Sequence, residues 1–407
     1  MKTLFVLIFL LLTHLVYAQP CGDTSFRKWY YAPLDTINTV HQFTTASGSV
    51  LLAGQYVPRS TTSEGLAVNL DGRGNLLWSK RYQPAEDQKS LILTRAIELS
   101  DDHLLLAGRQ FKKVGLAEME NNLVLLKTDS KGNVVWKEAY EAPGDGTTPI
   151  YITSVKEAPN GDLLVMGTRF GTEQQLFIFR IKASGTLQWS RSIGSDNTEF
   201  MSLIDGFLEG NDILLWANGN EGTCSSDSRS LNVFRLDFGS GKLKETKEFC
   251  LTSPDAPATF SSYPNQYKAR KVGSQYYIYG LLGEAQKDFA LYRFDASPSF
   301  IDGQAFYQPK NQRSFQLYLD DSGSFSFLQQ QGPADNRTLY FSTLHPDFSP
   351  KVQRQLNYTF SGLNNFAYEG GHLISTKASS ATAFALNYYN NAISSSVIEV
   401  LQVGPGL

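Results

Sequence analysis

Short apolar runs, separated by polar turns, recur along most of the chain, and many of them end at a glycine. They include "VLLAG" ending at Gly54, "LLLAG" at Gly108, "LLVMG" at Gly167 and "YYIYG" at Gly280. A run of this length between turn residues is typical of a β-strand. Several of these runs are followed by another that ends at an aspartate, such as "NLVLLKTD" at Asp129. The pattern predicts an all-β protein built from many short strands.

A glycine followed four residues later by a tryptophan is the second repeated feature. Glycine allows the positive φ of a tight turn between two strands, and tryptophan supplies a large apolar surface. The position recurs in successive units, whereas a binding site would occur once, so we expect these tryptophans to pack one unit against the next. The three copies are "GNLLWSKRY" with Trp78, "GNVVWKEAY" with Trp136 and "GTLQWSRSI" with Trp189.

The repeat predicts how the strands are assembled. Four strands joined by hairpins cannot bury both faces of their sheet, so successive units must stack on one another. Radial stacking produces a β-propeller of four-stranded blades. We expect seven blades and leave six or eight open. The third strands of the expected blades begin near Leu66, Leu123, Leu176, Leu231, Phe289, Leu339 and Phe384.

Closure of the ring has two candidate strands. "FRKWYYAPL" at 26–34 places Trp29 where a fourth strand would have it, with no earlier strands of its own. "SSSVIEVLQV" at 394–403 can also serve as the last fourth strand. Pairing an N-terminal strand with the C-terminal blade would protect the edges at the seam. The sequence leaves the choice open.

The start of the chain predicts export. Lys2 precedes an apolar run from Leu4 to Leu12, and small residues end at Ala18. This pattern is typical of a secretory signal peptide, which we place at 1–18, followed by a single propeller domain at 19–407. We expect no integral membrane segment in the mature chain. A secreted, periplasmic or cell-surface location fits equally well.

Composition and charge narrow the classes of partner. Charged residues make up 18% of the chain, the net charge is −3, and the basic residues are dispersed. A nucleic-acid-binding surface needs clustered basic residues, so we expect no nucleic-acid partner. We expect a monomer.

In an exported chain the three cysteines suggest a disulfide. We predict that Cys224 pairs with Cys250, because both fall on connections of the same unit, and leave Cys21 unassigned.

The connections differ between the two ends of the predicted ring. One end has tight turns, and the other carries the long segments 56–64, 110–122, 218–230 and 250–266, which we call the long-loop face. Varied loops on a rigid scaffold are the usual place for recognition. We name the aromatic residues of this face as candidate ligand contacts: Tyr56, Phe111, Phe260 and Tyr263.

Two segments carry a family resemblance. "NLDGRGNLLW" and "KTDSKGNVVW" resemble the repeat of quinoprotein-like (PQQ-like) propellers and of related bacterial exported propellers, with their Asp, Gly and Trp pattern before the outer strand. The resemblance implies the propeller fold. Quinoprotein dehydrogenases would also imply adjacent cysteines beside the cofactor, and Cys224 and Cys250 are not adjacent. We therefore expect no cofactor.

The sequence contains no catalytic motif that we recognise. His41, His103, His345 and His372 do not fall in a metal-ligand spacing, so we expect no metal site. The preferred function is a non-enzymatic exported propeller that binds a protein or carbohydrate through the long-loop face. The alternative is a propeller hydrolase or lyase that acts on a polysaccharide. It would use acidic rim residues such as Glu86, Asp87, Asp145, Asp196 and Asp255.

Overall fold

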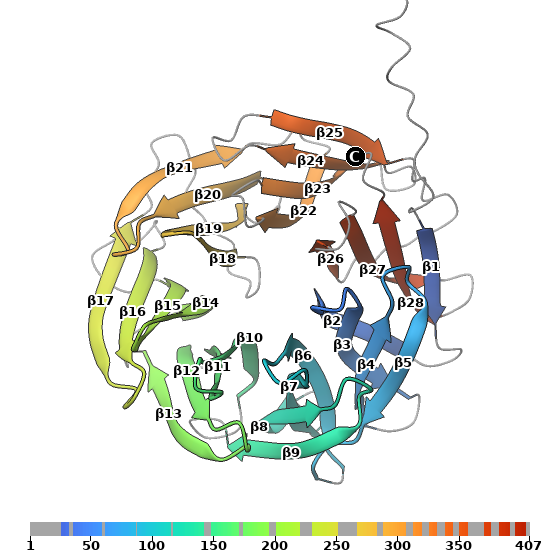
Figure 1. Cartoon of the computed structure of the whole chain (residues 1–407), viewed down its shortest axis with the longest axis horizontal. Helices are drawn as coiled ribbons and strands as arrows, with labels where there is room; N and C mark the ends of the chain where they lie inside the picture. The colour runs from blue at the N-terminus through green and yellow to red at the C-terminus, as the bar shows by residue number, and fades with distance from the viewer. Residues whose placement is uncertain are drawn as a thin grey trace, which may run out of the picture.

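The protein folds into radially arranged β-sheets around a central axis (Figure 1). The computed structural model describes residues 26–31, 36–58, 62–86, 88–114, 117–141, 148–170, 174–194, 201–219, 230–250, 267–282, 288–306, 312–319, 325–331, 338–344, 350–356, 370–375, 382–390 and 395–403. Within these residues the strands form seven four-stranded antiparallel sheets. The expected all-β propeller fold is confirmed. None of the described segments is a helix that could cross a membrane.

Each of the first six blades is a simple up-and-down sheet whose strands follow chain order from the axis outwards. Blade 1 contains β2 (Thr36–Thr44), β3 (Val50–Val57), β4 (Glu64–Leu70) and β5 (Leu76–Tyr82). Blade 2 contains β6 (Ser90–Glu98), β7 (Leu104–Val114), β8 (Ala117–Thr128) and β9 (Val134–Glu141). Blade 3 contains β10 (Ile150–Glu157), β11 (Leu163–Arg169), β12 (Gln175–Ile181) and β13 (Leu187–Ile193).

The remaining four blades complete the ring. Blade 4 contains β14 (Met201–Glu209), β15 (Asp212–Gly219), β16 (Ser230–Asp237) and β17 (Leu243–Cys250). Blade 5 contains β18 (Tyr267–Val272), β19 (Gln275–Leu282), β20 (Asp288–Phe294) and β21 (Phe300–Phe306). Blade 6 contains β22 (Gln312–Leu319), β23 (Phe325–Gln331), β24 (Thr338–Leu344) and β25 (Pro350–Leu356). The last blade contains β26 (Gly370–Ser375), β27 (Thr382–Asn390), β28 (Ser395–Val403) and β1 (Phe26–Tyr31).

The last blade joins the two ends of the chain. Its order is β26, β27, β28 and then β1, which pairs antiparallel with β28 from Phe26↔Gln402 to Tyr31↔Val397. The N-terminal strand is therefore the outermost strand. The segment "SSSVIEV" belongs to the third strand, and Phe384 lies in the second strand, not at the start of the third as we expected. The prediction took the second strand for the third because neighbouring strands have similar apolar alternation. The fourth strand of this blade, β1, comes from the other end of the chain.

The hydrophobic core consists of layers between adjacent blades. One layer joins blades 2 and 3, where Leu105 and Leu125 pack in the same cluster as Val165 and Phe177. Another joins blades 4 and 5, where Trp216 packs within 4.8 Å of Phe294 and 5.5 Å of Tyr276, measured between ring centroids. No single sheet can exclude water from both faces, so the apolar strands are buried by their neighbours in the ring.

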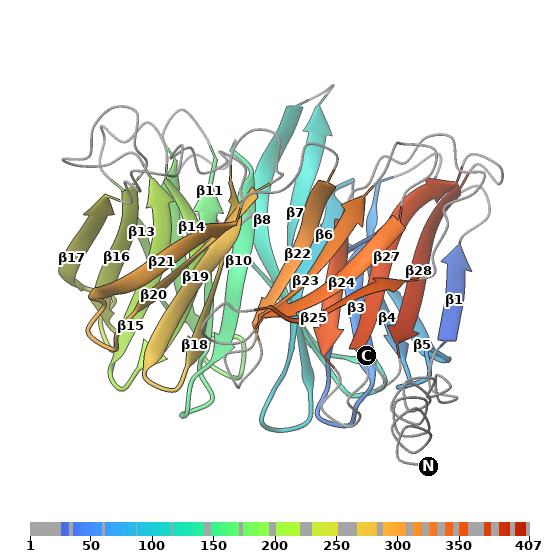
Figure 2. The ribbon, with the colours of Figure 1, turned by 90° about the horizontal axis from the view of Figure 1, so that it is seen from above.

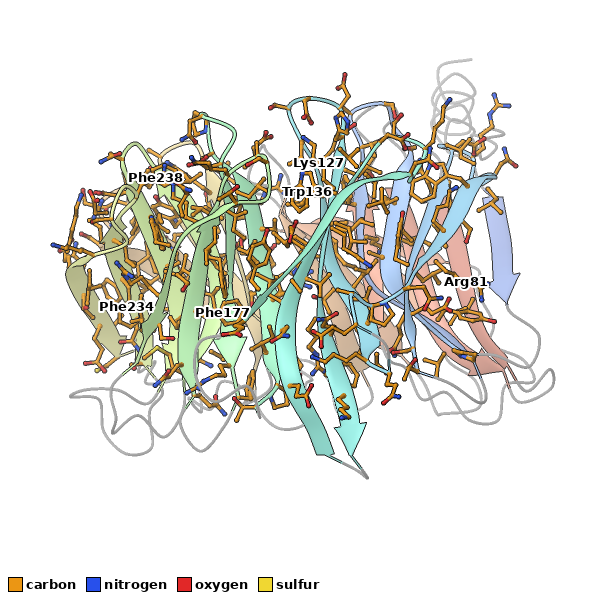
Figure 3. The ribbon with its side chains drawn as sticks, turned by 90° about the horizontal axis from the view of Figure 1, so that it is seen from below. Arg81, Lys127, Trp136, Phe177, Phe234 and Phe238 are labelled. Atoms are coloured by element: carbon orange, nitrogen blue, oxygen red, sulfur yellow. The ribbon has the colours of Figure 1, made fainter. Side chains whose placement is uncertain are left out.

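The repeated tryptophans link the outer strands of neighbouring blades. Trp78 of blade 1 donates an Nε1–H hydrogen bond to the Ser130 carbonyl of blade 2, and Trp136 of blade 2 donates one to the Ala183 carbonyl of blade 3. Each ring lies on the turn glycine of the next blade. Trp136 lies near the tight-turn end of the ring, opposite the projecting hairpin of β7 and β8 (Figure 3).

The aspartates before these turns bind the turn backbone. Asp129 Oδ1 accepts hydrogen bonds from the N–H groups of Lys131 and Asn133, at 2.9 and 2.8 Å. Asp71 holds the equivalent turn of blade 1 in the same way. These hydrogen bonds to the ionised carboxylate lower the pKa of Asp129, the largest contribution coming from the Asn133 side chain. These carboxylates therefore serve as hydrogen-bond acceptors within their turns.

Candidate functional site

The two ends of the ring are built differently. At one end the hairpins are tight, as in Thr45 to Ser49, whose Thr45 N–H donates to the Ser49 carbonyl at 2.8 Å. At the other end β7 and β8 project beyond the rest of the ring (Figure 2). Most of the segment 110–122, expected as a loop, is the extended end of this hairpin. The cross-strand hydrogen bonds of a two-stranded ribbon satisfy its backbone where no core covers it.

A polar network secures the base of this hairpin. Gln110 is fully buried, and its side chain accepts a hydrogen bond from the Ala85 N–H at 2.9 Å and donates one to Glu86 at 3.0 Å. The Lys89 side chain is 6% exposed and forms ion pairs with Glu86 and Glu120, at 2.9 and 3.2 Å. Burial alone would lower the pKa of Lys89, but its bonds to the two carboxylates outweigh this effect and raise it. The network joins the β5–β6 connection to the hairpin.

The candidate aromatic contacts have different surroundings. Tyr56 is half-buried, with the Arg81 guanidinium 4.6 Å from its ring centroid. Phe111 is 2% exposed and lies 4.7 Å from the Arg109 guanidinium, so its ring is part of the packing below the hairpin. Phe260 and Tyr263 lie outside the described residues. Of the two candidates that the structure describes, Tyr56 is partly exposed to solvent and Phe111 is buried.

The acidic and cysteine residues predicted on this face are described only in part. Among the acidic rim residues, Glu86 is held by Lys89 and Gln110, while Asp87, Asp145, Asp196 and Asp255 lie outside the described residues. Cys250 ends β17, and Cys224 is also outside the described residues, so their pairing stays a prediction.

The strands next to the axis share a feature that the sequence analysis did not identify. In β2, β6, β10, β14 and β22 the pairing register shifts by one residue at equivalent places, which marks a β-bulge. A bulge bends its strand and redirects the side chain that follows. The residue that resumes pairing after the shift lies opposite an equivalent position of the second strand in each blade. We call the residues at this position the axial level. They are His41, Arg95, Ser154, Asp205 and Gln316, together with Lys268 at the equivalent position of β18, which has no bulge.

The bulges explain the glycines that end the second strands. A Cβ atom at Gly108 would lie 2.1 Å from the Ile92 carbonyl oxygen, and one at Gly167 would lie 2.0 Å from the Tyr151 oxygen. The bulged inner strand therefore occupies the space that any other residue would need. In these blades the glycine of the "LLLAG" pattern marks the place where the inner strand changes register, and the axial-level residue follows it.

Side chains of the axial level reach from blade to blade. The His41 ring lies 3.2 Å from the Ala96 carbonyl of β6, measured from Nε2. Arg95 donates from Nε to the Thr153 carbonyl of β10 and from Nη1 to the Thr94 carbonyl of its own strand, both at 2.7 Å. Lys156 of β10 lies 3.6 Å from Asp205 of β14. These contacts follow the inner strands around the axis.

The pKa values of two basic side chains on the inner strands, Arg95 and Lys268, are lowered. Burial lowers the pKa of Arg95 to about 10, and the charge of Asp205 partly offsets this effect. Burial also lowers the pKa of Lys268 to about 8, and the like charge of Arg95 adds to the shift. The Lys268 side chain is nevertheless exposed to solvent. The lowered pKa and the solvent exposure are compatible if the ring surrounds the Lys268 side chain while water reaches it along the axis.

The axial level can therefore offer cationic and hydrogen-bonding groups to a ligand. Across the described part of the chain, no group of His, Cys, Asp and Glu side chains has a geometry that could hold a metal ion. Arg95 and Lys268 are instead donors that suit an oxyanion.

No protein-family model matches this sequence, and no curated protein matches it either. Solved structures that resemble the chain include β-propellers. A polysaccharide lyase, an ulvan lyase bound to -[GlcA(1-4)Rha3S]-, is 10% identical with a TM-score of 0.53, over 93% of this chain and 96% of that chain. Puromycin hydrolase is 11% identical with a TM-score of 0.51, over 90% of this chain and 55% of its own.

A third solved structure has a lower TM-score. The β-propeller domain of the Trilobed protease from Pyrococcus furiosus is 10% identical with a TM-score of 0.46, over 88% of this chain and 96% of that domain. At such identities a likeness shows the fold alone. The finer resemblance to PQQ-like propellers stays a prediction.

Proposed function

We propose that the protein is an exported propeller that binds a carbohydrate or protein ligand through its long-loop face. The observation that carries this proposal is the β7–β8 hairpin, which projects from one end of the ring on a buried polar base. Loops held on a rigid scaffold can recognise a ligand with little loss of conformational entropy. The described turns of the opposite end are short, and their polar groups bind one another.

The polar base indicates that the hairpin is held in one orientation. Lys89, Gln110 and Glu86 connect it to the preceding blade connection at hydrogen-bonding distance. Lys89 is a buried cation that forms ion pairs with two exposed carboxylates, so neutralising it removes both ion pairs at the base of the hairpin. The hairpin should therefore lose its fixed orientation when Lys89 is neutralised.

A second candidate function is the cleavage of a polysaccharide by a lyase or hydrolase. The observation that favours it is Lys268, whose pKa of about 8 would let part of its population accept a proton near neutral pH. One structure of similar fold is a polysaccharide lyase, which supports the fold of this chain and not its activity.

The test compares binding and turnover by the full chain. Neutral and acidic glycans on an array, together with pull-down of proteins, provide candidate ligands for the wild type, Lys89→Met and the matched control Lys182→Met. Lys182 is exposed beside a tight turn at the other end of the ring. We expect Lys89→Met to weaken binding by roughly tenfold and Lys182→Met to leave it unchanged.

Two results would overturn the binding proposal. One is the absence of any captured glycan or protein. The other is catalytic turnover of a bound polysaccharide, seen as new reducing ends or as the ultraviolet absorbance of an unsaturated product. Turnover would establish the second candidate instead.

A further inference from the structure

A row of contacting side chains runs from the base of the projecting hairpin to blade 3, the neighbouring blade (Figure 1). The Arg109 guanidinium of β7 contacts two rings, lying 4.7 Å from the centroid of Phe111 and 5.4 Å from that of Tyr151 in β10. The Tyr151 ring in turn meets the Phe170 ring edge-on, with 4.8 Å between the centroids. These contacts join four side chains of two blades into one feature, which we call the aromatic row.

The aromatic row changes from buried to exposed along its length. Phe111 and Arg109 are 2% and 7% exposed, whereas Tyr151 and Phe170 are partly exposed at the long-loop end of blade 3. Arg109 donates from Nη1 to Asn121 Oδ1 at 2.9 Å, and Asn121 is fully buried. The buried half of the row therefore holds the two outer rings in place. Rings held in this way lose little conformational entropy when a ligand binds them.

Phe170 lies between two other strand ends at this end of blade 3. Its N–H donates to the Pro149 carbonyl, just before β10, at 2.9 Å. On the other side, the pairing of Arg169 with Gln175 places Gln174 beside Phe170. Neighbouring strands lie about 4.8 Å apart, so the residues that flank Phe170 are roughly 10 Å from each other. That separation is comparable to the length of a disaccharide.

The flanking segments carry hydrogen-bonding atoms that are not satisfied within the described part of the chain. Thr148 Oγ1 and Gln174 Oε1 are buried, and no described residue forms a hydrogen bond with either atom. Both residues are partly exposed as a whole, so a rotation of the side chain brings each atom to the surface. An unsatisfied polar atom costs free energy that a hydroxyl group of a ligand can recover.

We infer that Tyr151 and Phe170 form a platform on which a sugar ring of a neutral oligosaccharide stacks, with its hydroxyl groups bound by Thr148 and Gln174. The inference rests on the proposed function and names the chemical class and the place of its ligand. A pyranose ring presents C–H groups that pack on an aromatic ring, and hydroxyl groups that pair with hydroxyl and amide groups. The four side chains carry no charge, which favours a neutral sugar over an acidic one.

The same arrangement suits a peptide less well. Peptide sites bury aromatic or aliphatic anchors in apolar pockets, or add an extended strand to a free sheet edge. The platform instead offers two partly exposed rings with polar atoms on either side, and both rings already pack on other side chains. A flat sugar ring with polar groups around its edge matches this surface.

Calorimetric titration of the full chain tests the inference. The neutral probes are cellohexaose, laminarihexaose, xylohexaose, maltohexaose and mannohexaose, and the comparators are an oligoglucuronate and a tryptophan-containing hexapeptide. The variants are Phe170→Ala, Phe170→Tyr, Gln174→Ala and Thr148→Val. Phe300→Ala is the matched control, because Phe300 is an aromatic residue that is 50% exposed at the tight-turn end of blade 5. Thermal unfolding of each variant shows whether it is folded.

We expect at least one neutral hexasaccharide to bind the wild type more tightly than either comparator. Phe170→Ala should weaken its binding roughly tenfold, Phe170→Tyr should keep it, and Phe300→Ala should have no effect. Gln174→Ala and Thr148→Val each remove one hydrogen bond, so each should weaken binding about threefold. In saturation-transfer NMR, the aromatic protons of the protein should transfer magnetisation to the C–H protons of the bound sugar, and Phe170→Ala should reduce this transfer.

Several results would overturn the inference. They are tighter binding of the peptide or of the oligoglucuronate, unchanged affinity of a folded Phe170→Ala variant, or an equal loss in Phe300→Ala. If the sugars bind Phe170→Ala normally but bind Lys89→Met weakly, the platform is wrong and the proposed function stands. The same holds if the wild type captures a protein and none of the sugars. If neither a sugar nor a protein binds the wild type, both are wrong.

Discussion

Trp78 packs its ring directly on Gly132, the turn glycine of the next blade. A Cβ atom at Gly132 would lie 2.9 Å from Trp78 Cζ3, and Gly132 has a φ of +78°. The same relation joins Trp189 to Gly241, where the distance would again be 2.9 Å. The glycine therefore serves its own turn and also the tryptophan of the preceding blade.

Gly132→Ala should destabilise the protein through both effects. We expect the free energy of unfolding to fall by about 2 kcal/mol, from the positive φ and the contact with Trp78. Gly210→Ala is the matched control, because Gly210 has a φ of +63° and nothing within 4 Å of a Cβ atom. Urea unfolding measures both. Equal losses for the two variants would mean that the tryptophan contact adds nothing.

A tyrosine four residues after each of two tryptophans holds the same turn. Tyr82 donates its hydroxyl hydrogen bond to the Gly132 carbonyl at 2.9 Å, and Tyr140 donates to the Gly185 carbonyl at 2.6 Å. Tyr82→Phe and Tyr140→Phe should each lower the free energy of unfolding by about 1 kcal/mol. The losses should add in the double variant, because the two contacts belong to different blade pairs. Phenylalanine variants as stable as the wild type would contradict this role.

Lys268→Met should stabilise the protein in a pH-dependent way. Burial lowers the pKa of Lys268 from 10.5 to about 8, so its charged form opposes folding. The gain from the substitution should be full below about pH 8, shrink as the pH rises, and vanish above the unfolded value of 10.5. Because this side chain is exposed, screening limits the gain to about 1 kcal/mol. Urea midpoints across this range measure it, and a gain independent of pH would contradict the assignment.

The N-terminal strand should be required for a stable ring. A chain that starts at residue 36 lacks β1 and leaves β28 as an unpaired outer edge. We expect a lower thermal midpoint and concentration-dependent association, because an unpaired edge can pair with another chain. A chain that starts at residue 19 is the control. Equal midpoints and a monomeric state for both would show that β1 is dispensable.

The local repeats made the propeller fold predictable. Alternating apolar runs, aspartates that begin turns, and a tryptophan after a glycine turn are short-range signals, so each blade could be recognised within its own segment. The last blade could not, because its fourth strand, β1, is distant in sequence from β28. Phe384 was assigned to the wrong strand for this reason.

The candidate site was harder to predict than the fold. His41, Arg95, Asp205 and Lys268 belong to four blades and share no motif. One signal was present in the sequence. The glycine that ends a second strand, as at Gly108, marks the place where the backbone of the inner strand lies too close for a Cβ atom. Reading it requires the pairing register, which a single sequence does not show. Phe111, by contrast, was named from its position in an expected loop and proved to be packed below a hairpin.

The sequence by itself determined the all-β class, the four-stranded unit and the turn chemistry, because these depend on alternation and on residues a few positions apart. Only the tertiary structure decided which strand closes the ring, how the glycine of one blade meets the tryptophan of another, and which polar residues gather at the axis. Those relations depend on the register between strands and on the radial placement of blades, and contacts over such sequence distances leave no periodic signal in a single chain.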